Sequence, residues 1–130
     1  MKTKILLFAA ILGLMNISMA TESQPAEKDV KIGITGVYVP GGFDSSADAY
    51  VVVNGIFQNG CYKWKNAEVV HKTSTEHEVT SVASVSQGMC IMVLIPFQKD
   101  IHLGQLVAGK HTLRFLNGDG TYLEKTMNVE

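Results

Sequence analysis

Residues 111–129 read HTLRFL-NGDG-TYLEKTMNV, two segments rich in β-branched, aromatic and aliphatic residues joined across a glycine turn. The turn, Asn117-Gly118-Asp119-Gly120, is the strongest hairpin signal in the chain, because Asn and Gly readily adopt the backbone angles of tight hairpins. Similar segments recur upstream at intervals of roughly 8–14 residues, without an amphipathic helical pattern. The sequence therefore predicts an all-β fold, a single antiparallel β-sandwich of about seven strands, with a closed small barrel as the alternative.

The predicted strands upstream differ in how clearly they alternate. They cover residues 30–39, 50–57, 61–72, 79–86 and 89–97. In the first of them the alternation slips at Gly36, which indicates a bulge or bend. Residues 89–97 (MCIMVLIPF) form the most apolar run of the chain after residue 20, so we expect a strand at the centre of the core. Pro96 should prevent this strand from pairing on both sides near its end.

The N-terminus has the three parts of an export signal. Lys2 and Lys4 supply positive charge, residues 5–14 (ILLFAAILGL) are apolar, and Ser18 and Ala20 are small residues placed for cleavage. The apolar run is shorter than the about 20 residues of a membrane span, which makes an uncleaved anchor the weaker alternative. We therefore expect a signal peptide at residues 1–20 and a product in the periplasm or secreted space.

Beyond the predicted signal the chain has room for one domain. Residues 21–29 are polar and predict a flexible lead-in, and residues 30–130 are the predicted sandwich domain. Without residues 1–20 the charge is −3, from 9 Lys and Arg against 12 Asp and Glu. With Arg114 as the one arginine and no basic cluster, nucleic-acid binding is not expected, and neither is stable membrane insertion after cleavage.

Cys61 and Cys90 are the two cysteines of the chain. In an oxidising compartment they allow a single pairing, so we expect a Cys61–Cys90 disulfide. The chain-entropy account gives such a bridge roughly 3–4 kcal/mol of stabilisation. Two free buried thiols are the alternative.

Several positions in the second half of the chain carry a resemblance. They are Gly60-Cys61, Cys90, Pro96-Phe97 and Leu103-Gly104-x-Leu106-x-x-Gly109-x-His111-x-Leu113-x-Phe115. This arrangement resembles exported bacterial immunoglobulin-like or fibronectin-III-like sandwich domains, which implies the same architecture. His111 stands where tyrosine is usual, and the cysteines are 29 positions apart, against roughly 60 in antibody domains. A resemblance of fold implies no particular function.

The residues that acid–base or nucleophilic chemistry needs are few. The histidines are His71, His77, His102 and His111, and no serine stands in a G-x-S-x-G elbow. Glu76-His77-Glu78 places carboxylates beside an imidazole, but neighbours on a strand face apart and neighbours on a loop face solvent. We therefore expect a protein that is not an enzyme, with no catalytic residues and no cofactor.

A soft metal site is the weaker interpretation of Met89, Cys90 and Met92. Cys90 and Met92 would share one face of a strand, which suits copper(I), but methionines in an apolar strand usually fill a core. We expect no metal site. Tyr62 and Trp64 also share a face of a predicted strand. Because one face of this strand must be buried in a sandwich, we expect these aromatic side chains in the core rather than on an exposed binding surface.

Residues 40–46 (PGGFDSS) predict a loop. Phe43 is apolar in a polar segment that includes Asp44, and Gly41 and Gly42 allow unusual backbone shapes. Because loops on a rigid sandwich often bind partners, we take Phe43, Gly41, Gly42 and Asp44 as the candidate binding residues. A flexible connection with Phe43 folded back is the alternative.

Together these observations predict a non-enzymatic binding or assembly protein of the cell envelope or secreted space. Its expected partner is a protein or a cell-surface component, in a surface apparatus or in contact with other cells. The alternatives are a small periplasmic metal-binding or redox-stress protein, and an inhibitor of an extracellular enzyme.

The export signal is tested by intact-mass measurement. We expect cleavage after Ala20, which leaves Thr21 as the first residue of the exported protein. A mass matching all 130 residues would contradict this prediction.

Overall fold

The computed structural model describes residues 26–130, which form eight strands and no helix. The strands are β1 (Glu27–Ile32), β2 (Gly36–Tyr38), β3 (Ala49–Phe57), β4 (Tyr62–His71), β5 (Glu76–Ser86), β6 (Ile95–Gly104), β7 (Gly109–Leu116) and β8 (Tyr122–Val129). β1 begins inside the segment 21–29 that was expected to be a flexible lead-in. The predicted signal peptide, residues 1–20, lies outside the described residues. No helix of the described part is long and apolar enough to cross a membrane.

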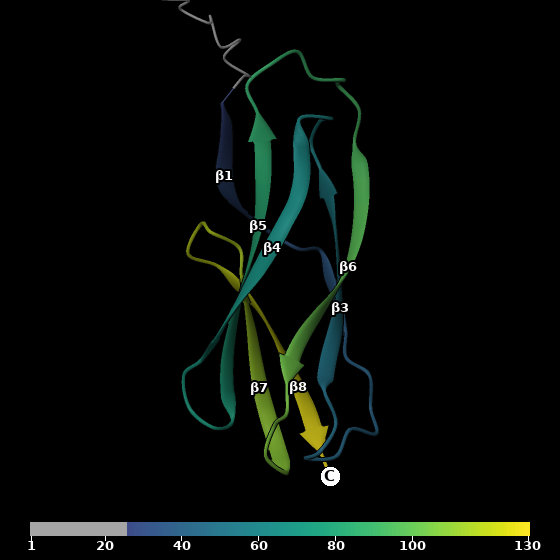
Figure 1. The fold of residues 1–130 in the computed structure, drawn as a ribbon, viewed down its shortest axis with the longest axis vertical. Coiled ribbons are helices and arrows are strands. Elements are labelled where there is room, and N and C mark those ends of the chain that lie inside the picture. The colour runs from purple at the N-terminus through teal and green to yellow at the C-terminus, as the bar shows by residue number, and fades with distance from the viewer. Residues whose placement is uncertain (1–25) are drawn as a thin grey trace, which may run out of the picture.

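The strands form two sheets, which confirms the all-β sandwich rather than the barrel (Figure 1). The larger sheet is organised around β5, which pairs with β4 along one edge. Its other edge is divided: residues 76–80 pair in parallel with β7, and residues 81–86 pair antiparallel with β1. β8 completes this sheet beside β7, and the smaller sheet has the order β2-β3-β6.

The slip at Gly36 marks a change of sheet, not a bulge within one strand. The chain leaves the larger sheet after Ile32 and enters the smaller sheet at Gly36, where β2 pairs with β3. A Cβ atom at Gly36 would lie 2.7 Å from Asn54 Oδ1, so glycine permits this close pairing. One predicted strand therefore becomes two, which accounts for eight strands instead of seven.

The core lies between the sheets and has two parts. The main cluster includes Val51 and Val53 of β3 and Leu113 and Phe115 of β7, each at most 1% exposed. A smaller cluster forms around Phe57, whose ring stacks on Phe97 with centroids 4.4 Å apart. Trp64 is half-buried and packs against both clusters, in agreement with its predicted core position.

The predicted central strand at residues 89–97 is wrong. Residues 87–94 form an exposed loop between β5 and β6, and β6 begins at Ile95 on the edge of the smaller sheet. β6 then continues to Gly104. An apolar run is compatible with a buried strand, but its hydrophobicity alone does not show that anything covers it.

The long edge strands of the two sheets carry lysines on their inner faces or a register shift. On β6, Lys99 pairs with buried Val53 and so shares its inner face, and on β8, Lys125 stands opposite buried Leu113. β4 carries a register shift between Trp64 and Asn66. Inward charges and bulges hinder the addition of a further strand.

Gly55 tests the packing of the smaller cluster. A Cβ atom there would lie 2.4 Å from Phe97 Cζ, and the Phe97 ring is held between Phe57 and Trp64. We expect Gly55→Ala to lower the free energy of unfolding by about 1–3 kcal/mol, measured by urea denaturation. Gly41→Ala, where nothing lies within 4 Å of the added atom, is the control and should be near neutral. Equal stability of the two variants would show that the ring moves aside freely.

Candidate functional site

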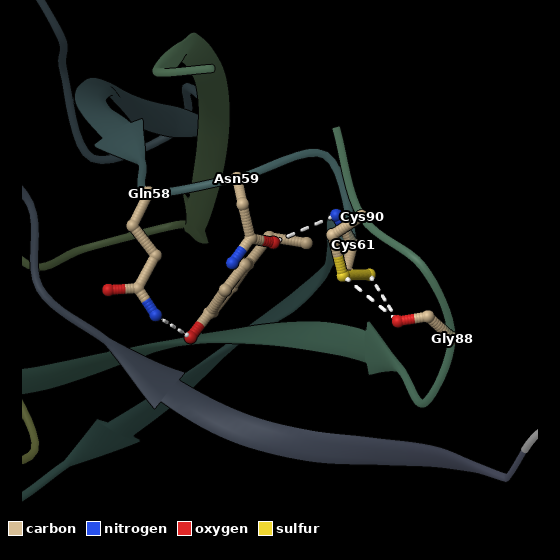
Figure 2. The surroundings of a disulfide bond; sticks show 6 residues. Gln58, Asn59, Cys61, Gly88 and Cys90 are labelled. Carbon is tan, nitrogen blue, oxygen red and sulfur yellow. Dashed lines mark hydrogen bonds between the residues drawn. A yellow bond between two sulfur atoms is a disulfide. The ribbon is translucent and has the colours of Figure 1, made fainter. Parts of the chain in front are cut away.

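A disulfide joins the β3–β4 turn to the loop between β5 and β6. Cys61 and Cys90 form the predicted bridge (Figure 2). Cys61 is buried, with 4% of its surface exposed. Hydrogen bonds support both sides of it: the Gly60 amide donates to the Ile91 carbonyl at 2.8 Å, and the Ser86 amide donates to the Cys61 carbonyl at 3.0 Å. The bridge therefore fixes one end of the sandwich.

Residues 87–94, here called the apolar loop, carry the largest group of exposed apolar side chains in the described part of the chain. Their exposed fractions are 105% for Met89, 72% for Ile91, 80% for Met92, 51% for Val93 and 70% for Leu94. Large contiguous apolar patches on a protein surface usually mark an interaction site. The apolar loop is therefore the strongest candidate binding surface.

The sequence segment that contains the apolar loop has no charged residues. Residues 79–98 contain no Asp, Glu, Lys or Arg. The soft ligand set considered above is not available in this form, because the Cys90 sulfur is bound to Cys61 and is no thiolate. Met89 and Met92 are left as exposed apolar side chains, which adapt readily to irregular surfaces.

The predicted binding loop, residues 40–46, lies at the other end of the sandwich, beside the C-terminus (Figure 1). Phe43 is half-buried against the main cluster, its ring meets Tyr50 edge-on at 5.4 Å, and its carbonyl accepts a hydrogen bond from the Glu130 amide. Phe43 thus contributes to the fold. Its role in binding stays a prediction.

The neighbours of Phe43 form an ordered turn. Gly42 has a φ of 86°, in the left-handed region that favours glycine, and nothing lies within 4 Å of a Cβ built at Gly41. Asp44 Oδ1 accepts hydrogen bonds from the Ser46 hydroxyl at 2.6 Å and the Ser46 amide at 2.9 Å. These bonds lower the pKa of the Asp44 carboxyl.

Near that same end, three histidines form a hydrogen-bonded chain that ends on a backbone carbonyl. His71 Nδ1 lies 2.6 Å from His77 Nδ1, His77 Nε2 lies 2.8 Å from His111 Nδ1, and His111 Nε2 lies 2.6 Å from the Val107 carbonyl. His77 is 2% exposed and His111 is fully buried, whereas His71 is at the surface. β4, β5 and β7 each supply one ring.

The Val107 carbonyl, at the end of the row of three histidines, determines which ring nitrogens carry protons. Because a carbonyl only accepts, His111 Nε2 must donate, which leaves His111 Nδ1 to accept from His77 Nε2. The neutral His77 ring then accepts at Nδ1 from His71, so the N–H groups all point inward and the outer His71 Nε2 carries a lone pair. These tautomers follow from the heavy-atom distances and the chemistry of the carbonyl.

The surroundings of His77, the central ring of the three, keep it neutral at pH 7. Burial, followed by repulsion from His71 and His111, lowers the pKa of His77 from 6.5 to about 4. The three rings lie in a row and do not converge on one point, and no metal-binding group of three His, Cys, Asp or Glu side chains occurs among residues 26–130. Glu78 faces away and lies 3.6 Å from Lys72 Nζ, so the Glu76-His77-Glu78 run assembles no acid–base set.

The family comparison covers most of the sandwich. Residues 51–129 match the family model described as the ORF11 β-sandwich domain. The chain belongs to this family. The match includes the disulfide, the apolar loop and the three histidines, and it begins after residues 40–46. No curated protein and no solved structure matches the chain.

The histidine chain predicts a decrease in stability below neutral pH. The folded-state pKa of His77 is depressed, so below pH 6.5 the unfolded state binds more protons, and stability falls with pH until about pH 4. Between pH 7.0 and 5.5, above the range where carboxylates titrate, we expect His77 to account for a loss of about 1 kcal/mol. Urea unfolding at both pH values measures it.

The matched control for this experiment is His102, an exposed histidine that does not belong to the three hydrogen-bonded histidines. Its Nδ1 lies 3.1 Å from Asp48 Oδ2. His77→Gln should reduce the stability difference between the two pH values, and His102→Gln should not. An unchanged difference in His77→Gln would show that His77 does not resist protonation in the folded state.

Proposed function

We propose that this chain is an exported, non-enzymatic binding or assembly protein of the cell envelope or secreted space, which docks through its apolar loop. The observation that carries the proposal is the exposure of five aliphatic side chains on a loop held by a disulfide. Leaving such side chains in water is unfavourable, so their burial by a partner supplies a driving force for association.

Two features of the scaffold support docking through this loop rather than through a strand edge. Lys99, Lys125 and the irregular β4 hinder strand addition at the long edges. The disulfide and the Gly60–Ile91 hydrogen bond restrict the loop before it meets a partner, which lowers the entropy lost on binding.

Export is the second part of the proposal. It rests on the signal-like pattern of residues 1–20, and a disulfide is typical of oxidising compartments outside the cytosol. An immunoglobulin-like architecture of the bacterial exported type is the finer fold assignment that we propose. A role in a surface apparatus or in contact with other cells agrees with such a location.

Site-specific photocrosslinking in intact cells tests the proposal. We expect a photoreactive phenylalanine analogue at position 92 to give discrete cross-linked species, because Met92 projects from the apolar loop. The same analogue at position 38 is the control, since Tyr38 is 67% exposed but lies on β2. Identical patterns from the two positions would remove the apolar loop as the docking surface.

A further inference from the structure

We infer that the apolar loop is the contact surface of a symmetric dimer, so that a second copy of this chain covers it. This inference rests on the proposed function, in which the loop docks to a macromolecule. It goes further by naming the partner and by assigning the geometry, a two-fold axis that places one apolar loop against the other.

The area of the loop fits such a dimer. At the exposed fractions given above, its five apolar residues, backbone included, present on the order of 700 Å² to solvent, close to the roughly 800 Å² that each partner contributes to an interface of standard size. A contact that covered all of this area on both loops would reach the size of a specific interface.

The absence of charge from residues 79–98 favours contact between identical surfaces. A two-fold interface brings like residues near one another, so any charge in the patch would face its own copy and be repelled. At the rim, β1 begins with Glu27, which pairs in register with Ser86, and Lys28 follows. The rim thus carries both signs, and symmetry places no net charge against itself.

The backbone of the loop favours a protein surface over the interior of a membrane. Among residues 87–94, Ile91 accepts from the Gly60 and Val93 amides, but the segment belongs to neither sheet ladder. Irregular backbone in hydrocarbon leaves polar groups without hydrogen-bond partners, which is strongly unfavourable. Across a protein interface, the partner and trapped water can satisfy these groups.

The position of the loop makes the contact sterically accessible. In Figure 1, where the long axis is vertical, the loop crosses the top of the sandwich from the end of β5 to the start of β6. Two copies can therefore meet end to end, and the guarded edges of both sheets remain in solvent. The disulfide ties Cys90 of the loop to Cys61 (Figure 2), which restricts the loop in each copy and so favours a symmetric contact.

Sedimentation velocity of the exported protein, at concentrations of roughly 1–100 μM, tests the inference. We expect a reversible monomer–dimer equilibrium that Met92→Glu weakens at least tenfold, because the substitution places one carboxylate from each copy in an otherwise uncharged contact. Met92 is 80% exposed, so thermal unfolding should show that the variant remains folded. Tyr38→Glu, which replaces an exposed apolar side chain elsewhere with the same charge, should dimerise as the wild type does.

The outcomes separate this inference from the proposed function. A monomer at every concentration overturns the dimer, and so does a dimer that Met92→Glu leaves intact. If the chain is monomeric but position 92 still cross-links to a different protein in cells, the dimer is wrong and the proposed function stands. A monomer that floats with phosphatidylcholine vesicles would assign the loop to a lipid surface and overturn the inference as well.

Discussion

The pairing of β5 on both edges is the constraint on which the rest of the structure depends. One edge is occupied by β4, and the other is divided between β7 and β1. This division lets a single strand support both ends of the sandwich. Its first half places His77 between His71 and His111, and its second half ends at Ser86, whose amide binds the Cys61 carbonyl. The histidine chain and the disulfide are therefore fixed by the same strand.

Much of the fold could be predicted from the sequence because half-buried strands show an alternation of apolar and polar residues. β3 alternates between buried positions and positions that are half-buried or exposed, as residues 50–57 predict. The disulfide was accessible for a different reason, since two cysteines leave one pairing. The expected strand at residues 89–97 failed because a continuous apolar run has no alternation, and so nothing in it distinguishes a covered strand from an exposed loop.

The histidine chain lay beyond sequence reasoning for a topological reason. His71 and His77 flank a short turn, so their pairing across β4 and β5 follows from a hairpin register. His111 reaches His77 through the parallel pairing of β5 with β7, and no local signal specifies a parallel partner that is distant in sequence. Phe43 was ambiguous for a related reason: only the packing of the loop against the main cluster shows that its ring supports the core.

The two ends of the sandwich differ in what they expose to solvent. At one end, the His77 and His111 rings are buried, and every N–H that joins the three histidines to one another and to the Val107 carbonyl has an acceptor, so hydrogen bonds hold this end together. At the other end, five aliphatic side chains are kept in water although their exposure favours aggregation. Lysines on the sheet edges confine that tendency to the loop. Because the disulfide limits the conformations in which the loop can present its side chains, the proposed association through the loop would be restricted to partners of complementary shape, which separates specific docking from non-specific adhesion.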